Sequence, residues 1–284
     1  MQRNDFILTL SCPDRVGIVY NVSGLLLKHQ GNIIDAQQFG DEETGRFFLR
    51  VHFVLPEGAI INRLEQEFKP LGEQFQMEWK IHDAQRKARL LILVSKQGHC
   101  LNDLLFRVSS RQLHAEIVGI VSNHPDFAEM AQSNGVPFHY LPVTPETKAE
   151  QEAKILAIAE RDRSDLIVLA RYMQILSPEL CRALQGRAIN IHHSFLPSFK
   201  GARPYYQAHA RGVKIIGATA HYVTHDLDEG PIIEQDIERV DHAMSAQDLT
   251  QVGSDVESLV LSRAVRSHVE HRILLNGTRT VVFR

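Results

Sequence analysis

The segment Ile189–His193 places an asparagine and two histidines at the end of an apolar run. Because successive side chains of a strand alternate between its faces, Asn190 and His192 are expected on one face and His193 on the other. An amide beside an imidazole forms a set of hydrogen-bond donors suited to a developing oxyanion. The spacing therefore predicts a candidate oxyanion site at Asn190 and His192, and a hydrogen-bonded structural histidine at His193.

A metal site is a weaker interpretation of the same residues. Neighbouring histidines that point to opposite faces do not chelate one ion, and no C-x-x-C pattern accompanies them. We therefore expect no metal here.

Chemistry at such a site also needs a group that moves protons. The segment His221–Ile233 supplies three carboxylates in a Gly-Pro loop, namely Asp226, Asp228 and Glu229. Loops often carry aspartate only because it favours turns. A carboxylate held against an imidazole in a partly dry cleft, however, gains a pKa suited to general acid-base work. The pattern alone does not choose among the three.

The strands that would position these groups are apolar runs that follow Leu90. They are LLILV, EIVGIVSN, LIVLA, AINIHH and KIIGATAHYV, with helix-like segments between the early ones. Strands that are apolar on both faces and alternate with helices are typical of a mostly parallel sheet covered on both sides. We therefore predict a Rossmann-like α/β domain.

Ligands of such sheets bind outside the carboxyl ends of the strands. Polar residues follow four of the predicted strands, at 95–97, 123–124, 171–173 and 190–193. These four strand exits are expected to meet at one edge of the sheet and to form a cleft.

The first 82 residues follow the order strand, helix, strand, strand, helix, strand, which is typical of a ferredoxin-like unit. The expected strands are 6–10, 32–39, 47–55 and 77–82, and the expected helices run from Pro13-Asp14 to Gly31 and from Asn62 to Phe75, with an interruption near Pro70. The short charged segment Asp83–Arg89 is expected to link two domains, which we place at 1–84 and 85–284.

The composition favours a globular protein that acts on small molecules. A net charge of -3, from 31 basic and 34 acidic residues spread along the chain, provides no footprint for nucleic acid or a membrane surface. Cys12, Cys100 and Cys181 suit neither a disulfide framework nor a zinc knuckle. No stretch approaches the roughly 18 apolar residues of a membrane span. We expect a cytoplasmic protein with buried thiols.

Three blocks together resemble the formyltransferase domain that uses 10-formyltetrahydrofolate. They are LARYMQILSP at 169–178, INIHHSFLPSFKGARPYYQAHARG at 189–212 and GATAHYVTHDLDEGPII at 217–233. This resemblance extends over residues 88–284, whereas residues 1–82 resemble an ACT domain. An ACT domain ahead of this catalytic domain resembles the formyltetrahydrofolate deformylase family, which hydrolyses 10-formyltetrahydrofolate to formate and tetrahydrofolate.

The resemblance implies a role for each candidate residue. The family's Asn-x-His pair corresponds to Asn190 and His192, which would stabilise the oxyanion. Its L-D-x-G aspartate corresponds to Asp228, which would take a proton from water and help deliver one to the folate nitrogen. The loop that would line the pterin pocket comprises Arg171, Tyr172, Met173, Gln174, Ile175 and Leu176. Packing between a strand and a helix would also explain the apolar residues of this loop. No metal or cofactor is implied, and the formate released would supply purine synthesis and balance the one-carbon folate pools.

Two rival functions remain. The glycinamide ribonucleotide transformylases share this domain and hold a substrate phosphate on a G-x-G-S-N loop after the first strand. Here that loop is SKQGHC, with the single Gly98, which favours water over a phosphate-bearing amine as the acceptor. The second rival is a folate or amino-acid sensor without turnover. The complete set of Asn190, His192 and Asp228 argues against it.

The resemblance to an ACT domain implies regulation by a small amino acid. Asp14, Arg15 and Gly17, before the first helix, are the candidate effector contacts. Asp14 and Gly17 also have structural interpretations, as a helix N-cap and a close-packing residue. Pairing of the small sheets between subunits predicts a homo-oligomer, either a tetramer or a hexamer.

Overall fold

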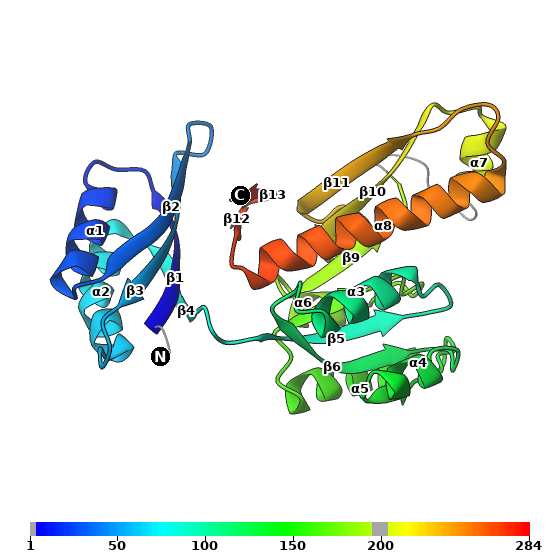
Figure 1. The fold of residues 1–284 in the computed structure, drawn as a ribbon, viewed down its shortest axis with the longest axis horizontal. Helices are drawn as coiled ribbons and strands as arrows, with labels where there is room; N and C mark the ends of the chain where they lie inside the picture. Colours follow the sequence, from blue (N-terminus) through cyan, green and yellow to red (C-terminus); the bar gives the residue numbers. More distant parts are fainter. Residues whose placement is uncertain (1–3, 195–203) are drawn as a thin grey trace. The chain divides into compact units, whose positions relative to one another are not determined.

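The computed structural model describes residues 4–194 and 204–284, and the chain divides into two compact units (Figure 1). The first unit combines Met1–Lys87 with Glu270–Arg284, and the second is Ala88–Val269. The segment 195–203, which belongs to one of the blocks quoted above, lies outside the described residues.

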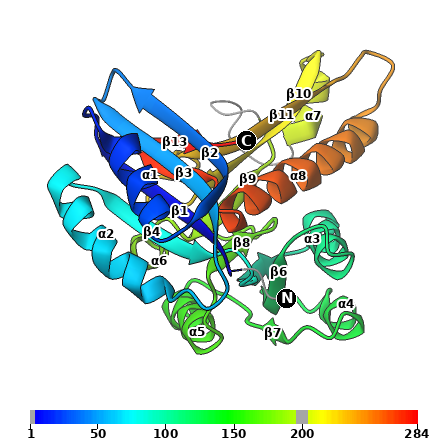
Figure 2. The same ribbon diagram turned by 60° about the vertical axis from the view of Figure 1, so that its left-hand side comes forward.

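The first unit has the predicted order of elements. They are β1 (Asn4–Pro13), α1 (Ile18–Lys28), β2 (Asn32–Asp41), β3 (Arg46–Leu55), α2 (Ile61–Phe75), β4 (Glu78–Asp83), β12 (Ile273–Asn276) and β13 (Arg279–Val282). The first four strands form an antiparallel sheet in the order β2-β3-β1-β4, and α1 and α2 lie on one of its faces (Figure 2). Leu8, Phe53, Leu64 and Phe68 are fully buried between the sheet and these helices.

Two local predictions in this unit were wrong. Pro70 does not interrupt α2, which continues through it to Phe75. Proline removes one helical hydrogen bond, but Pro70 is exposed, so water can reach the carbonyl left without a partner, while Leu64 and Phe68 hold the helix to the core. Asp14 is not the N-cap of α1, because Gly17 occupies that position with φ of 96°. A positive φ, rather than close packing, explains this glycine.

The C-terminal hairpin of β12 and β13 packs with the first unit, although the predicted division assigned it to the second domain. The guanidinium of Arg50 donates to the carbonyl oxygens of Glu270, at 3.0 Å, and His271, at 3.2 Å. The ring of His271 stacks on that of His82 with 3.6 Å between centroids. These contacts join residues more than 180 positions apart, which no local pattern reveals.

The second unit contains a seven-stranded sheet in the order β11-β10-β9-β8-β5-β6-β7. Its elements are β5 (Ala88–Val94), α3 (His99–Ser109), β6 (Ala115–Ser122), α4 (Ala128–Ser133), β7 (Phe138–Tyr140), α5 (Lys148–Arg161), β8 (Leu166–Leu169), α6 (Pro178–Ala183), β9 (Ala188–His192), α7 (Pro204–Ala210), β10 (Ile215–Tyr222), β11 (Ile232–Arg239) and α8 (Ala246–Val269). The neighbouring strands β9, β8, β5, β6 and β7 are parallel. Strand β10 is antiparallel to both β9 and β11. The predicted mostly parallel sheet is confirmed.

Helices cover both faces of this sheet. Figure 2 shows α3 and α8 on one side of the strands and α5 and α6 on the other. Leu91, Ile155 and Leu184 belong to one buried cluster on the second side. The three cysteines are free and buried, as predicted. Among the described residues, no helix combines the length and the hydrophobicity of a membrane span.

Candidate active site

The site begins where β9 and β10 pair. Their antiparallel register places Asn190 directly opposite His221. A register shift at Ala220/His221 interrupts the pairing of β10 with β11. Because Asn190 and His221 are opposite each other in β9 and β10, their side chains meet, with 3.3 Å between the amide nitrogen of Asn190 and Nε2 of His221.

The loop between β10 and β11 folds back on β10 and carries the carboxylate of the site, Asp228. Tyr222 donates its backbone N–H to the carbonyl of Pro231 at 3.0 Å. A Cβ at Gly230 would lie 1.7 Å from the carbonyl oxygen of Tyr222, so only glycine permits this approach. Asp228, two residues earlier, has φ of 58°, a left-handed conformation that aspartate tolerates better than most residues.

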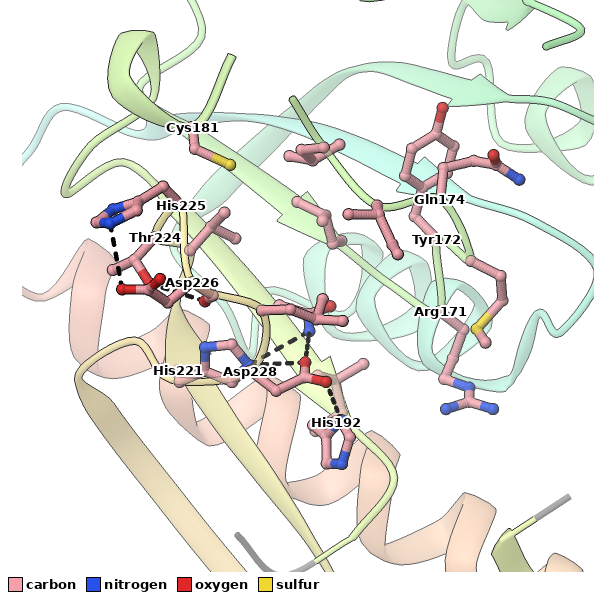
Figure 3. A pocket seen from close by; sticks show the side chains of 18 of the residues that line it. Arg171, Tyr172, Gln174, Cys181, His192, His221, Thr224, His225, Asp226 and Asp228 are labelled. Atoms are coloured by element: carbon pink, nitrogen blue, oxygen red, sulfur yellow. Dashed lines mark hydrogen bonds and ion pairs between the residues drawn. The ribbon is translucent and has the colours of Figure 1, made fainter. Parts of the chain in front are cut away.

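Asp228 lies between two histidines (Figure 3). Its Oδ2 is 3.3 Å from Nδ1 of His192, and its Oδ1 is 3.7 Å from Nε2 of His221. Partial burial acts to raise the pKa of Asp228, but the hydrogen bonds and charges of the two histidines outweigh it and hold that pKa well below its usual value. The carboxyl is therefore ionised at neutral pH.

The ionised carboxylate determines how His192 is protonated. A carboxylate only accepts hydrogen bonds, so Nδ1 of His192 must carry the proton between them. Nε2 of the same ring is buried and has no hydrogen-bond partner among the described residues. Protonation of His192 therefore creates a free N–H donor at Nε2, aimed away from Asp228.

His221 is fixed by the main chain. Its Nδ1 lies 2.9 Å from the carbonyl oxygen of Tyr222, which only accepts, so Nδ1 carries a proton. Nε2 is then the acceptor of the ring. It accepts from the amide of Asn190 at 3.3 Å and lies 3.7 Å from Oδ1 of Asp228. His221 thereby orients both Asn190 and Asp228.

These groups open into a cavity of about 310 Å³. Its walls include all of the predicted catalytic residues and the loop 171–176, together with residues of the loop after β10. Asn190, His192 and Asp228, which are distant in the sequence, are thus brought together around one space, as predicted.

Comparison with known proteins assigns the chain to a family. Residues 88–265 match the model of the formyl transferase family, and residues 6–69 match that of the ACT domain. A formyltetrahydrofolate deformylase from a Corynebacterium species is 49% identical over 98% of this chain and 98% of its own length. One from Bacillus subtilis is 48% identical over 97% of this chain and 93% of its own. The chain belongs to the formyltetrahydrofolate deformylase family.

Solved structures agree. The formyltetrahydrofolate deformylase of Burkholderia mallei is 54% identical, with a TM-score of 0.96 over 99% of this chain and 100% of that one. A glycinamide ribonucleotide transformylase from Symbiobacterium toebii is 28% identical, with a TM-score of 0.65, over 70% of this chain and 95% of that one. The deformylase likeness covers the whole chain, whereas the transformylase likeness covers part of it.

The loop 171–176, which is predicted to bind the pterin in this member of the deformylase family, contains two kinds of residue. Met173 and Ile175 are 58% and 61% exposed and line the cavity, which core packing does not explain. The Tyr172 hydroxyl instead accepts from Gln151 at 2.6 Å within the buried core. The Arg171 guanidinium is buried too and donates to neighbouring side chains. These two residues contribute to the wall while their polar ends serve the fold.

The four predicted strand exits do meet. They line a second cavity of about 410 Å³, which shares Arg171, Met173, Gln174 and His193 with the first. In the loop SKQGHC, a Cβ at Gly98 would lie 2.4 Å from the ring of Phe127. Packing therefore requires this glycine, in agreement with its structural interpretation.

Sequence reasoning missed two residues of the site region, His221 and Glu257. His221 interrupts the apolar run GATAHYV, and a histidine buried in such a strand is a weak indication of function. Its position opposite Asn190 depends on an antiparallel register that the run does not specify. Glu257, fully buried in the middle of α8, has no local pattern that marks it.

One group among the described residues has the composition of a metal site. Ligand atoms of His99, Cys100 and Glu257 lie within 4.8 Å of one another, apart from the Asp228 site. Glu257 already accepts from Tyr205 and His99, and burial raises the pKa of the Cys100 thiol, so that it stays protonated. A protonated thiol and a saturated carboxylate make a poor donor set.

The candidate effector residues lie together before α1. Asp14 and Arg15 are exposed, and Arg15 donates to the side-chain oxygen of Gln76 at 2.8 Å. The backbone N–H of Asp14 donates to the carbonyl of Gly45 at 2.9 Å. Their role in binding an effector stays a prediction.

Proposed function

We propose that this member of the formyltetrahydrofolate deformylase family hydrolyses 10-formyltetrahydrofolate through Asn190, His192 and Asp228. The observation that carries the assignment is the arrangement of His192, whose Nδ1 faces an ionised aspartate and whose Nε2 is buried without a partner among the described residues. In the protonated ring the Nε2–H is a donor without a partner among the described residues, and the formyl oxygen would accept from it.

The reaction begins with attack of water on the formyl carbon. Asp228 takes a proton from this water as general base, at the carboxylate that His192 and His221 hold ionised. Negative charge then develops on the formyl oxygen. The Nε2–H of His192 and the amide of Asn190 donate to that oxygen, and each such donor is worth about 3 kcal/mol in the transition state.

Collapse of the tetrahedral intermediate breaks the bond between the formyl carbon and the folate nitrogen. The leaving nitrogen needs a proton, and the proton that Asp228 accepted from water returns to it. The products are tetrahydrofolate and formic acid, which ionises to formate and releases one proton to solvent, so atoms and charge balance with one water consumed. The exposed Met173 and Ile175 provide apolar walls for the flat pterin ring.

The test is incubation of the protein with 10-formyltetrahydrofolate and no acceptor, with formate and tetrahydrofolate both quantified. Hydrolysis predicts release of the two in equal amounts. Glycinamide ribonucleotide is the matched addition, because a transferase would form its formyl derivative and accelerate. An absolute requirement for this amine would overturn the assignment.

We further propose that the first unit binds an amino-acid effector near Asp14, Arg15 and Gly17 and that the protein is a homo-oligomer. Support for the second proposal is the exposure of large apolar side chains on the first unit. Val16, Tyr20 and Leu27 are 101%, 80% and 75% exposed, and exposed apolar clusters are typical of interaction surfaces. Equilibrium sedimentation tests the assembly, and calorimetric titration with amino acids tests the effector.

The cellular setting is also a proposal. Three free cysteines favour a reducing compartment, and we propose the cytoplasm. There the formate released would supply reactions that incorporate one-carbon units, including purine synthesis. Growth of a deletion strain with and without added formate and purines tests this role.

A further inference from the structure

Glu257 is a buried carboxylate that the proposed reaction does not use. Its side chain is 1% exposed in the middle of α8, and three groups from other elements surround it. The hydroxyl of Tyr205 donates to Oε1 at 2.6 Å, and Oε2 lies 2.7 Å from Nε2 of His99 and 3.3 Å from Nε of Arg171. Burial acts to raise the pKa of Glu257, but His99 and Arg171 outweigh it and keep that pKa below its usual value. A charge so deeply buried is retained only with partners of this kind.

Arg171 connects this carboxylate to the active-site strand. Its guanidinium is 7% exposed, and the residue has φ of 63°, which is uncommon outside glycine. Nη1 donates to Nδ1 of His193 at 2.8 Å, and Nε donates to the side-chain oxygen of Gln97 at 2.8 Å. Because a guanidinium only donates, Nδ1 of His193 must accept, which places the ring proton on Nε2.

His193 is consequently held in the neutral form. Burial, then the charges of Arg171 and His192, lower the pKa of His193 to about 4. Its ring stacks on that of His192 with 4.7 Å between centroids. The groups that face this chain of contacts are His99 and Cys100 of α3, Arg171 after β8, His192 and Asp228 of the site, and Tyr205 of α7.

We propose that Glu257 is a positioning residue for the hydrolysis. It balances the charge of Arg171, and Arg171 in turn holds His193 neutral against His192, so that the charge on His192 is governed by Asp228. The inference rests on the proposed function, since it concerns the protonated form of His192 that donates to the formyl oxygen. Glu257 acts through Arg171 and His193, and it touches neither water nor the folate.

The pH profile of kcat distinguishes this role from structural support. Glu257→Gln preserves size and removes charge, which leaves the positive charge of Arg171 without compensation. That charge disfavours the protonated form of His192, so the alkaline limb of the profile is expected to move to lower pH by about one unit. Tyr205→Phe removes a hydrogen bond to Glu257 without changing charge, and Glu257→Asp keeps the charge. Both controls are expected to leave the limb in place.

A uniform loss of kcat at every pH, with the limb of Glu257→Gln unmoved, would overturn the proposal. The proposed function is tested separately, by whether the wild-type protein hydrolyses 10-formyltetrahydrofolate at neutral pH. The wild-type protein also provides a test that needs no folded variant of Glu257. In ¹⁵N-histidine spectra from pH 5 to 8, the ring of His193, assigned by its loss in His193→Asn, is expected to remain neutral with its proton on Nε2. Protonation of His193 between pH 5 and 8 would contradict the proposal. A proton on Nδ1 of its neutral ring would also contradict it.

Discussion

His192 and His193 are neighbours whose rings stack, yet they face charges of opposite sign. The carboxylate of Asp228 lies 3.3 Å from Nδ1 of His192, and the guanidinium of Arg171 lies 2.8 Å from Nδ1 of His193. A carboxylate only accepts and a guanidinium only donates, so the same ring atom carries a proton in one histidine and a lone pair in the other. One partner is enough to place the ring proton of identical side chains on different nitrogens.

This difference gives two consecutive histidines separate surroundings. His192, at the last position of β9, has a buried Nε2 that makes no hydrogen bond among the described residues. His193 belongs to a network that ends in the buried Glu257. The contrast teaches that the partner of each ring, and not the histidine itself, determines which ring nitrogen carries the proton.

Loss of Asp228 is expected to have the largest effect. Asp228→Asn removes the general base and the negative partner of His192 together, so kcat is expected to fall by about 10³-fold or more. Formate release measures turnover, and calorimetry with the folate measures binding, which is expected to survive. Turnover within tenfold of the wild type would show that Asp228 does not have this role.

Exchange of each histidine for asparagine sharpens the comparison. His192→Asn removes the donor at Nε2 and is expected to lower kcat by about 10²- to 10³-fold. His193→Asn keeps an acceptor for Arg171 and is expected to lower kcat by less than about tenfold. The ratio of the two kcat values is the measurement, and equal losses would contradict distinct roles.

The neutral member of the pair is expected to make stability depend on pH. The pKa values of His193 and of His268, which is buried beside Tyr222, are each lowered to about 4, in both cases mainly by burial. Between pH 6.5 and 5 the unfolded histidines take up protons and the folded ones do not. The free energy of unfolding therefore decreases as the pH is lowered from 6.5 to 5, by about 1–2 kcal/mol for each histidine.

Urea unfolding at several pH values measures this effect. His268→Gln removes one of the two groups and is expected to flatten the dependence by about half, with His225→Gln, an exposed histidine, as the control. A wild-type protein as stable at pH 5 as at pH 6.5 would disprove the burial of two neutral histidines.

Removal of metal is expected to have the smallest effect. Dialysis against a chelator should leave formate release within about 20% of the untreated rate, because the proposed donors are Asn190 and His192 and the base is Asp228. Restoration of lost activity by one added divalent ion would instead point to His99, Cys100 and Glu257 as ligands.

Much of the fold follows from the hydrophobic pattern. The alternation in the first 82 residues and the continuous apolar runs after Leu90 each predicted the sheet that the structure contains. The pattern gave wrong predictions where contacts between residues distant in the sequence determine the structure. Pro70 remains helical because Leu64 and Phe68 anchor α2 in the core, and the hairpin of β12 and β13 packs with the first unit through Arg50.

The candidate site was predictable where chemistry is encoded locally. Asn190 and His192 share a strand, so their spacing alone predicted a pair on one face. Asp228 could be chosen among three acids only through a family resemblance, because the close approach at Gly230 that positions it is a tertiary contact. His221 and Glu257 escaped prediction for the same reason, since each acts on a partner from another element.

The C-terminal hairpin gives the chain an unusual order of synthesis. The second unit is inserted between two segments of the first, so residues up to Lys87 emerge from the ribosome long before Glu270–Arg284. At typical elongation rates the delay is roughly 10–40 s. During that interval the early segment exists without β12 and β13, and the first unit is completed only after Glu270–Arg284 has been synthesised. Expression of residues 1–87 alone would therefore yield the nascent form of this unit and not its mature one.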